Sequence, residues 1–190
     1  MIIRKKIKYM RSLLLLSLLI TTWLSINAQK VYTKNGTISF YSKASIENIA
    51  ADNSQVMSTL DIATGQLQFS VLIKAFHFKK SLMEQHFNED YMESDKFPKA
   101  TFKGNIKDFK IDLAKDGSYP VSVTGDMTIH GVTKNITSAG TIIVKAGVIT
   151  GNASFKIKLA DYKVSIPTVV KDNISETVDV SVSCIYDKKM

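Results

Sequence analysis

Three histidines, His77, His86 and His130, are the side chains of this sequence best suited to metal binding or proton transfer. Their positions do not give the i, i+4 spacing on a helix or the i, i+2 spacing on a strand that brings two ligands to one metal ion. We therefore predict no metal site, and we interpret His77 and His86 as structural or surface residues. His130 stands beside Gly131, where a turn could present its ring to the mouth of a cavity or hydrogen-bond it to the backbone.

Nucleophilic catalysis has little support in the residue pattern. The sequence has no Gly-x-Ser-x-Gly elbow and no glycine-rich phosphate loop. Its single cysteine, Cys184, is in phase with neighbouring valines, which predicts a buried thiol. Acidic residues are frequent between positions 89 and 95, where the pattern predicts the solvent-facing side of a helix and its exit, so they are ordinary surface acids. We predict a protein that is not an enzyme and uses no cofactor. The alternative is an enzyme acting on a quinone or isoprenoid with His130 as general base, although no acid in the adjoining sequence is obviously placed to orient that ring.

The elements that position these side chains have the pattern of half-buried β-strands. Apolar and polar residues alternate, as in Leu67, Phe69 and Val71, and turn pairs such as Asn35-Gly36 and Asp116-Gly117 separate the segments. We expect eight or nine strands near 37–42, 45–50, 54–62, 66–76, 99–112, 119–130, 132–145, 147–160 and 175–186. So many antiparallel strands in one domain predict an all-β fold, an antiparallel barrel of about eight strands, because closure removes exposed edges.

One segment, from residue 82 to 92, has a helical period instead. Ser81 and Glu84 have the spacing of a capping box, and Met83, Phe87 and Tyr91 then recur every four residues. This pattern predicts a short amphipathic helix whose apolar stripe covers one end of the barrel.

The first 28 residues have the pattern of a signal peptide. Five basic residues and no acid precede an apolar run too short to cross a bilayer, and the run ends near Ala28. We expect cleavage there, a mature domain at 29–190, and a periplasmic or secreted location. Five of the 25 basic residues belong to the signal, so 20 remain against 17 acidic residues and the net charge falls from +8 to +3. We therefore expect no nucleic-acid partner. A membrane-inserted barrel is a further alternative. The poor aromatic girdles and the charged C-terminal end argue against stable insertion.

The interior of the barrel is the remaining candidate for function. An eight-stranded barrel is wide enough either to be filled by its own side chains or to hold one small ligand, and the alternation of residues does not decide between them. A filled barrel would be a structural or protein-interaction module. The residues that we expect to contact a ligand are Phe40, Phe69, Phe76, Phe87, Phe102, Met127, Ile129, His130 and Phe155.

Two motifs carry a resemblance to a known family. The segment Lys-Phe-Pro-Lys-Ala-Thr-Phe-Lys-Gly at 96–104 and the segment Gly-Asp-Met-Thr-Ile-His-Gly-Val-Thr-Lys at 125–134 together resemble the paired signature of the YceI-like family. The resemblance covers about residues 36 to 186. It implies an extended lipocalin-like antiparallel barrel that is typically exported and binds polyisoprenoid chains in its interior. We therefore expect this protein to hold a polyisoprenoid or similar apolar lipid without catalysis, as a carrier or a store.

The sequence also departs from the family pattern in two places. Residues 42 to 65 lack the usual Gly-x-Phe hairpin pattern, and Asp161-Tyr162-Lys163 stands where many members have an acidic residue, an aromatic residue and glycine. These departures indicate a divergent branch, and they bear on the ligand more than on the fold.

Overall fold

The structure is a computed structural model that describes residues 30–44, 47–112, 115–168, 170 and 174–189. The expected signal peptide lies outside these residues. Eight long strands form the body of the molecule: β1 (Lys30–Ser42), β2 (Ile49–Asp61), β3 (Gln66–Leu72), β5 (Lys99–Ile106), β6 (Gly117–Ile129), β7 (Val132–Lys145), β8 (Val148–Lys158) and β9 (Thr177–Tyr186). Shorter elements are η2 (Ile73–Ala75), β4 (His77–Phe78), α2 (Ser81–His86), η3 (Phe87–Tyr91), η4 (Leu159–Tyr162) and β10 (Lys188–Lys189).

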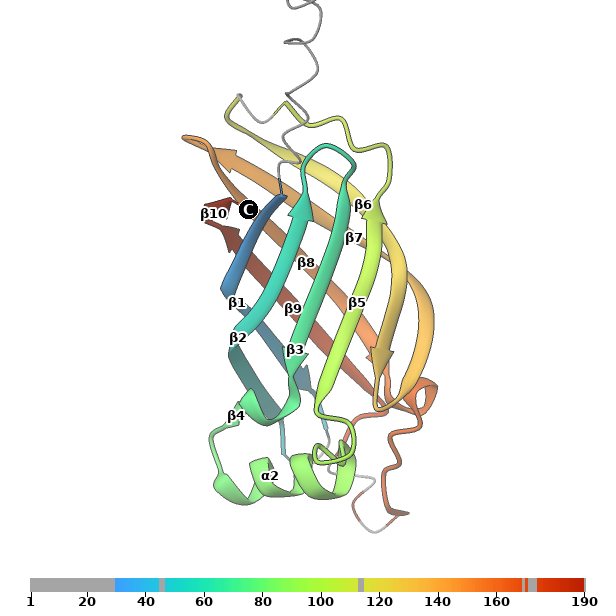
Figure 1. The fold of residues 1–190 in the computed structure, drawn as a ribbon. Coiled ribbons are helices and arrows are strands. Elements are labelled where there is room, and N and C mark those ends of the chain that lie inside the picture. The colour runs from blue at the N-terminus through green and yellow to red at the C-terminus, as the bar shows by residue number, and fades with distance from the viewer. Residues whose placement is uncertain (1–29, 45–46, 113–114, 169, 171–173, 190) are drawn as a thin grey trace, which may run out of the picture.

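The long strands close into an antiparallel barrel (Figure 1). Their order around the sheet is β1-β9-β8-β7-β6-β5-β3-β2, and β2 pairs again with β1. Phe40 of β1 lies opposite Val180 of β9 on one side and Ala51 of β2 on the other. Because β1 is paired along both edges, neither end of the chain leaves a free edge in the body of the barrel. The predicted all-β fold, an antiparallel barrel of about eight strands, is confirmed.

Successive side chains point alternately into the barrel and out to solvent, as the sequence pattern predicts. On β9, Val178, Val180, Cys184 and Tyr186 are buried, whereas Asp179 is exposed. The thiol of Cys184 is fully buried, and this burial raises its pKa to about 12. Cys184 is therefore an interior residue and not an activated thiolate, in agreement with the sequence.

The strand boundaries in the first third of the chain differ from those predicted. The predicted break between separate strands at 45–50 and 54–62 is wrong, because β2 runs unbroken from Ile49 to Asp61. Residues 45 and 46 lie outside the described residues. Asn53 is 1% exposed, its side-chain amide donates to the Leu72 carbonyl at 2.9 Å, and its side-chain oxygen accepts from the Gln55 amide at 2.8 Å. Asn53 is of a residue type common in loops, but it can lie inside the strand because its hydrogen bonds are satisfied there. Gly36, expected in a turn before the first strand, lies within β1 at an irregularity of its pairing with β2.

Two other strands end earlier than predicted. β3 gives way to the turn η2 after Leu72, and β5 ends at Ile106.

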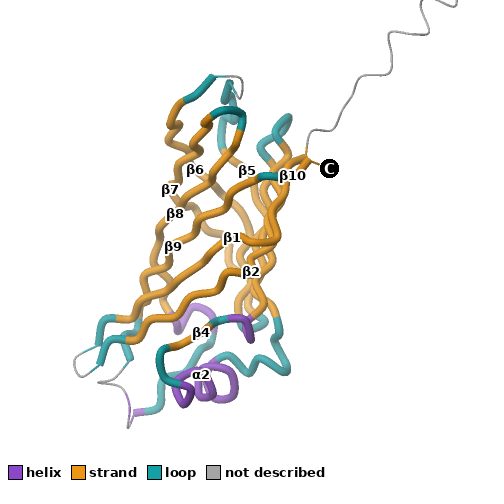
Figure 2. The backbone as a smooth tube through the Cα atoms, turned by 90° about the vertical axis from the view of Figure 1, so that its left-hand side faces the viewer, coloured by secondary structure: helices purple, strands orange, loops and turns teal. Residues whose placement is uncertain are grey.

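The predicted helix exists and lies across one end of the barrel (Figures 1 and 2). Its start differs from the prediction, because Ser81 is already helical and Lys80 is the N-cap residue, without a side-chain cap. The carboxylate of Glu84 accepts a hydrogen bond from the Phe78 amide at 3.1 Å, so it joins the helix to β4 and does not complete a capping box. The second half is a π-helical turn, η3, in which the Met92 amide donates to the Phe87 carbonyl at 2.9 Å.

The position where the family pattern has glycine has a left-handed backbone here. Lys163 follows η4 with φ of 56°. This conformation costs an ordinary L-residue about 1 to 2 kcal/mol. A glycine would escape that cost but would lose about 0.4 to 1 kcal/mol through the greater entropy of its unfolded chain.

We therefore expect Lys163→Gly to raise the free energy of unfolding by about 0.5 to 1 kcal/mol, measured by urea denaturation. The matched control is Lys158→Gly, which removes the same side chain from the extended strand β8 and should lower stability by about 0.5 to 1 kcal/mol. If both variants lose the same free energy of unfolding, the backbone at Lys163 carries no strain.

Candidate functional site

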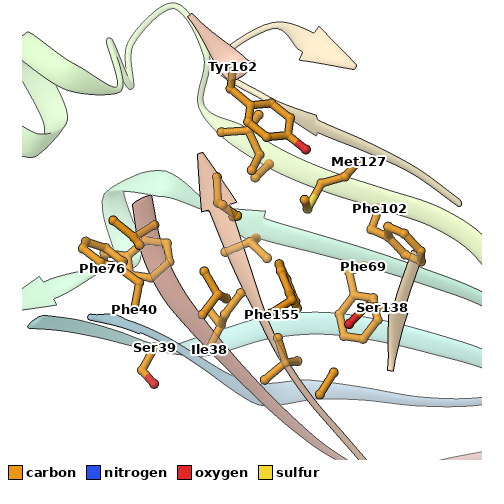
Figure 3. Close-up of a pocket in the computed structure, with 18 of the residues that line it drawn as sticks. Ile38, Ser39, Phe40, Phe69, Phe76, Phe102, Met127, Ser138, Phe155 and Tyr162 are labelled. Carbon is orange, nitrogen blue, oxygen red and sulfur yellow. The ribbon is translucent and has the colours of Figure 1, made fainter. Parts of the chain in front are cut away.

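A cavity of about 400 Å³ occupies the barrel interior and extends to the end covered by the helix. The residues of its wall come from the inward faces of the strands and from α2 and η3. Figure 3 shows residues from the strands, among them Phe69, Phe102 and Phe155. The predicted ligand-contact residues that line the cavity are Phe40, Phe69, Phe76, Phe87, Phe102, Met127, Ile129 and Phe155. The interior is therefore not filled by its own side chains.

Small residues on two neighbouring strands leave this space open. Ser138 and Gly140 on β7 and Gly151 and Ala153 on β8 all face the cavity. Gly140 lies opposite Ala153, and Gly151 lies opposite Ile142. These four residues were not among those predicted to contact a ligand. The signal that could have found them is the run of small side chains at positions whose alternation faces inward.

The two signature motifs form a neighbouring part of the wall. Gly104 of β5 lies directly opposite Gly125 of β6. The ring of Phe102 covers this pair so closely that a Cβ atom on Gly104 or Gly125 would lie 2.6 Å or 2.8 Å from the ring. Only glycine fits at either position, because a Cβ atom would also lie 2.4 Å from the carbonyl oxygen of Thr124 or Lys103 on the facing strand. Phe102 itself faces the cavity.

A cluster of four phenylalanines joins the helix to the barrel. The ring of Phe87 packs against Phe40, Phe76 and Phe78, with centroid separations of 5.6, 5.6 and 5.0 Å. These separations are typical of favourable aromatic pairs. The predicted apolar stripe of the helix, Met83, Phe87 and Tyr91, lines the cavity. Phe78 was not predicted, although its spacing from Phe76 could have suggested it.

Charged groups are confined to the margin of the cavity. Among its described lining residues there is no lysine or arginine, and the ionisable side chains apart from tyrosines are Glu47 and His86, both exposed residues. The predicted surface position of His86 therefore lies beside the opening of the cavity. The wall itself is almost wholly apolar, so the site favours a neutral ligand.

His130 lies next to this end of the barrel but does not occur among the described residues that line the cavity. Its Nδ1 is 3.2 Å from the Tyr162 carbonyl oxygen, and its Nε2 is 2.8 Å from a carboxylate oxygen of Glu93. The hydrogen bond with His130 lowers the pKa of Glu93, although partial desolvation opposes it. No partner for this histidine could be predicted from the sequence, because Glu93 lies 37 residues away along the chain.

Phe97 and Gly131 complete this cluster. The Phe97 ring packs edge-on against the His130 ring with a centroid separation of 4.7 Å. Gly131 has φ of 73°, and a Cβ atom there would lie 2.5 Å from the Phe97 ring. The His-Gly pair of one motif therefore packs against Phe97 of the other, and His130 links the β6–β7 turn, the exit of the helix and η4.

Two further features bear on the function. Within the described residues, no three side chains of His, Cys, Asp or Glu are grouped so that they could hold a metal ion. No helix in the described part of the chain is both long and apolar enough to cross a bilayer.

Solved structures of other proteins have a fold similar to this barrel. The polyisoprenoid binding domain from Saccharophagus degradans implicated in plant cell wall breakdown is 18% identical, with a TM-score of 0.70, over 84% of this chain and 97% of that one. BcnA of Burkholderia cenocepacia is 18% identical, with a TM-score of 0.65, over 79% of this chain and 95% of that one. The YCEI protein of Campylobacter jejuni is 21% identical, with a TM-score of 0.60, over 78% of this chain and 88% of that one. These similarities establish the fold.

No curated protein sequence matches this chain significantly. The family model of the YceI-like domain matches residues 29–185, which include both motifs and all eight strands of the barrel apart from the last residue of β9. The chain therefore belongs to the YceI-like domain family.

Proposed function

We propose that this protein is an exported binding protein that holds an apolar, isoprenoid-like lipid inside its barrel, as a carrier or a store and without catalysis. The observation that carries the proposal is the cavity of about 400 Å³, enclosed by apolar side chains and covered by a helix. Sites for small ligands are commonly concave, apolar and of this size. The similar structure from Saccharophagus degradans, described as a polyisoprenoid binding domain, supports the same class of ligand.

The dimensions of the cavity limit the part of the ligand that it can enclose. The lining residues reach from the small side chains of β7 and β8 to the helix, so the barrel encloses only the part of an apolar chain that lies between them. Burying several hundred Å² of such a chain contributes on the order of 10 kcal/mol before the costs of association are subtracted. We infer that a short isoprenoid fits inside, and that a longer one extends past the helix or displaces it.

Native mass spectrometry of the protein, purified gently from its host, tests the proposal directly. We expect a co-purifying apolar adduct, and we expect the polypeptide mass to correspond to a chain that begins at Gln29 after removal of the signal. A protein that carries no adduct and takes up no added farnesol would contradict the binding proposal. A chain that keeps residues 1–28 in its mature form would contradict the proposed signal cleavage.

Filling the cavity should prevent binding. Ala153→Phe places a ring in the space beside Gly140, so we expect uptake of farnesol to fall at least tenfold, measured by displacement of the neutral fluorescent probe N-phenyl-1-naphthylamine. The matched control is Ser154→Phe, on the outward-facing side of the same strand, which should leave uptake unchanged. If Ala153→Phe folds with a normal circular dichroism spectrum and still binds farnesol as well as the wild type does, the ligand lies elsewhere.

The helix should control access to the cavity. Phe87→Glu puts a charge into the cluster of four phenylalanines, which loosens the helix and should speed release of a fluorescent polyprenyl probe several-fold in stopped-flow measurements. Leu82→Glu makes the same change on the exposed side of this helix, where the residue is 62% exposed, and should have little effect. Equal release rates in the two variants, with both barrels folded, would show that the ligand enters by another route.

A further inference from the structure

The Tyr162 hydroxyl is a polar group in an otherwise apolar part of the cavity wall. The residue is 4% exposed, and its side chain lines the cavity. Figure 3 shows the hydroxyl pointing into the interior, on the side of Met127. Within the described part of the chain, no group hydrogen-bonds to this hydroxyl. The hydrogen bond between Tyr162 and His130 is made by the backbone carbonyl of Tyr162. The hydroxyl oxygen itself is not fully buried, so this group is open to a molecule inside the cavity.

The other buried polar side chains that face the cavity are satisfied by the protein. The Tyr186 hydroxyl is 2.8 Å from Ser58 Oγ. Ser42 Oγ accepts a hydrogen bond from the Ser175 amide at 3.0 Å. Tyr162 differs from both, since its hydroxyl is free to bond with a molecule inside the cavity.

The backbone of Tyr162 is held in place, so its hydroxyl has a defined position. The Tyr162 carbonyl accepts a hydrogen bond from His130, and Glu93 holds the other side of the His130 ring. The Val164 amide donates to the Leu159 carbonyl at 3.2 Å, which closes the turn around Tyr162. A donor fixed in this way loses little entropy when it binds a ligand.

The surroundings determine which chemical group can be the partner. No lysine or arginine occurs among the described residues that line the cavity, so an anionic group beside Tyr162 would lack a counterion. Burial, followed by the nearby negative charge of Asp161, raises the pKa of Tyr162, so the hydroxyl keeps its proton and can donate it. A neutral acceptor oxygen meets both conditions.

We propose that the Tyr162 hydroxyl is a specificity-determining hydrogen-bond donor, which selects apolar ligands that carry a neutral acceptor oxygen, such as a ketone, on the part enclosed by the barrel. This inference rests on the proposed lipid binding and deepens it by naming the class of ligand. A pure hydrocarbon of the same shape gains no hydrogen bond from this hydroxyl, so it lacks this contribution to binding.

The experiment compares two neutral probes of the same size: geranylacetone, and the hydrocarbon in which a C=CH2 group replaces its C=O group. Kd values come from displacement of N-phenyl-1-naphthylamine. We expect Tyr162→Phe to raise the Kd of geranylacetone about three- to tenfold and to change the Kd of the hydrocarbon less than twofold. The carbonyl stretching band of bound geranylacetone should lie at lower wavenumber in the wild type than in Tyr162→Phe.

The matched control is Tyr186→Phe, which removes a cavity-lining hydroxyl that Ser58 already satisfies. This variant should have a lower melting temperature but the same preference between the two probes as the wild type. If Tyr162→Phe changes both Kd values equally, or leaves the carbonyl band unmoved, this inference is overturned while lipid binding stands. If neither probe binds to the wild type, both proposals are overturned.

Discussion

The pairing of β1 along both of its edges is the constraint on which the rest of the structure depends. Its hydrogen bonds to β2 and β9 join the start of the domain to its end and turn a sheet into a barrel. Once the barrel is closed, strict alternation divides each strand into an inner and an outer face. Eight strands then set a width at which side-chain volume decides whether the interior is filled. In this chain Gly140, Gly151 and Ala153 leave it open.

Polar contacts around the covered end stay outside the apolar space and hold its parts together. Glu84 bonds to the Phe78 amide beside the cluster of four phenylalanines, and Glu93 bonds to His130 beyond the far end of η3. Glu84 lies on the helical segment and Glu93 follows its end. Each is hydrogen-bonded to a group outside the segment, Glu84 to β4 and Glu93 to His130. The apolar stripe of the same segment, Met83, Phe87 and Tyr91, faces the cavity. This division lets the segment cover an apolar ligand without placing a charge against it.

Much of this architecture could be predicted from the sequence, because a period of two residues determines which side chains share a face. The inward positions of Phe69, Phe102 and Phe155 follow from it directly. The cavity could not be predicted from this period, since its volume depends on which small residues oppose one another across β7 and β8. The break expected near Asn53 was wrong because distant backbone groups satisfy that side chain within the strand. The link between Glu93 and His130 could not be predicted either, since only the folded chain brings these residues together.

The motif residues and the residues that shape the cavity occupy different positions in the barrel. Gly104 and Gly125 let β5 and β6 face each other without a clash between a Cβ atom and the facing backbone, and Gly131 makes room for Phe97, so these glycines are required by packing whatever the barrel contains. His130 acts one step from the cavity by fixing the backbone of Tyr162. The side chains that give the interior its volume and its free donor, from Ser138 to Ala153 and at Tyr162, lie outside the two motifs. The motifs can therefore be kept while the ligand changes, because a substitution at one of these inner positions alters the cavity and leaves the packing of the motif glycines intact.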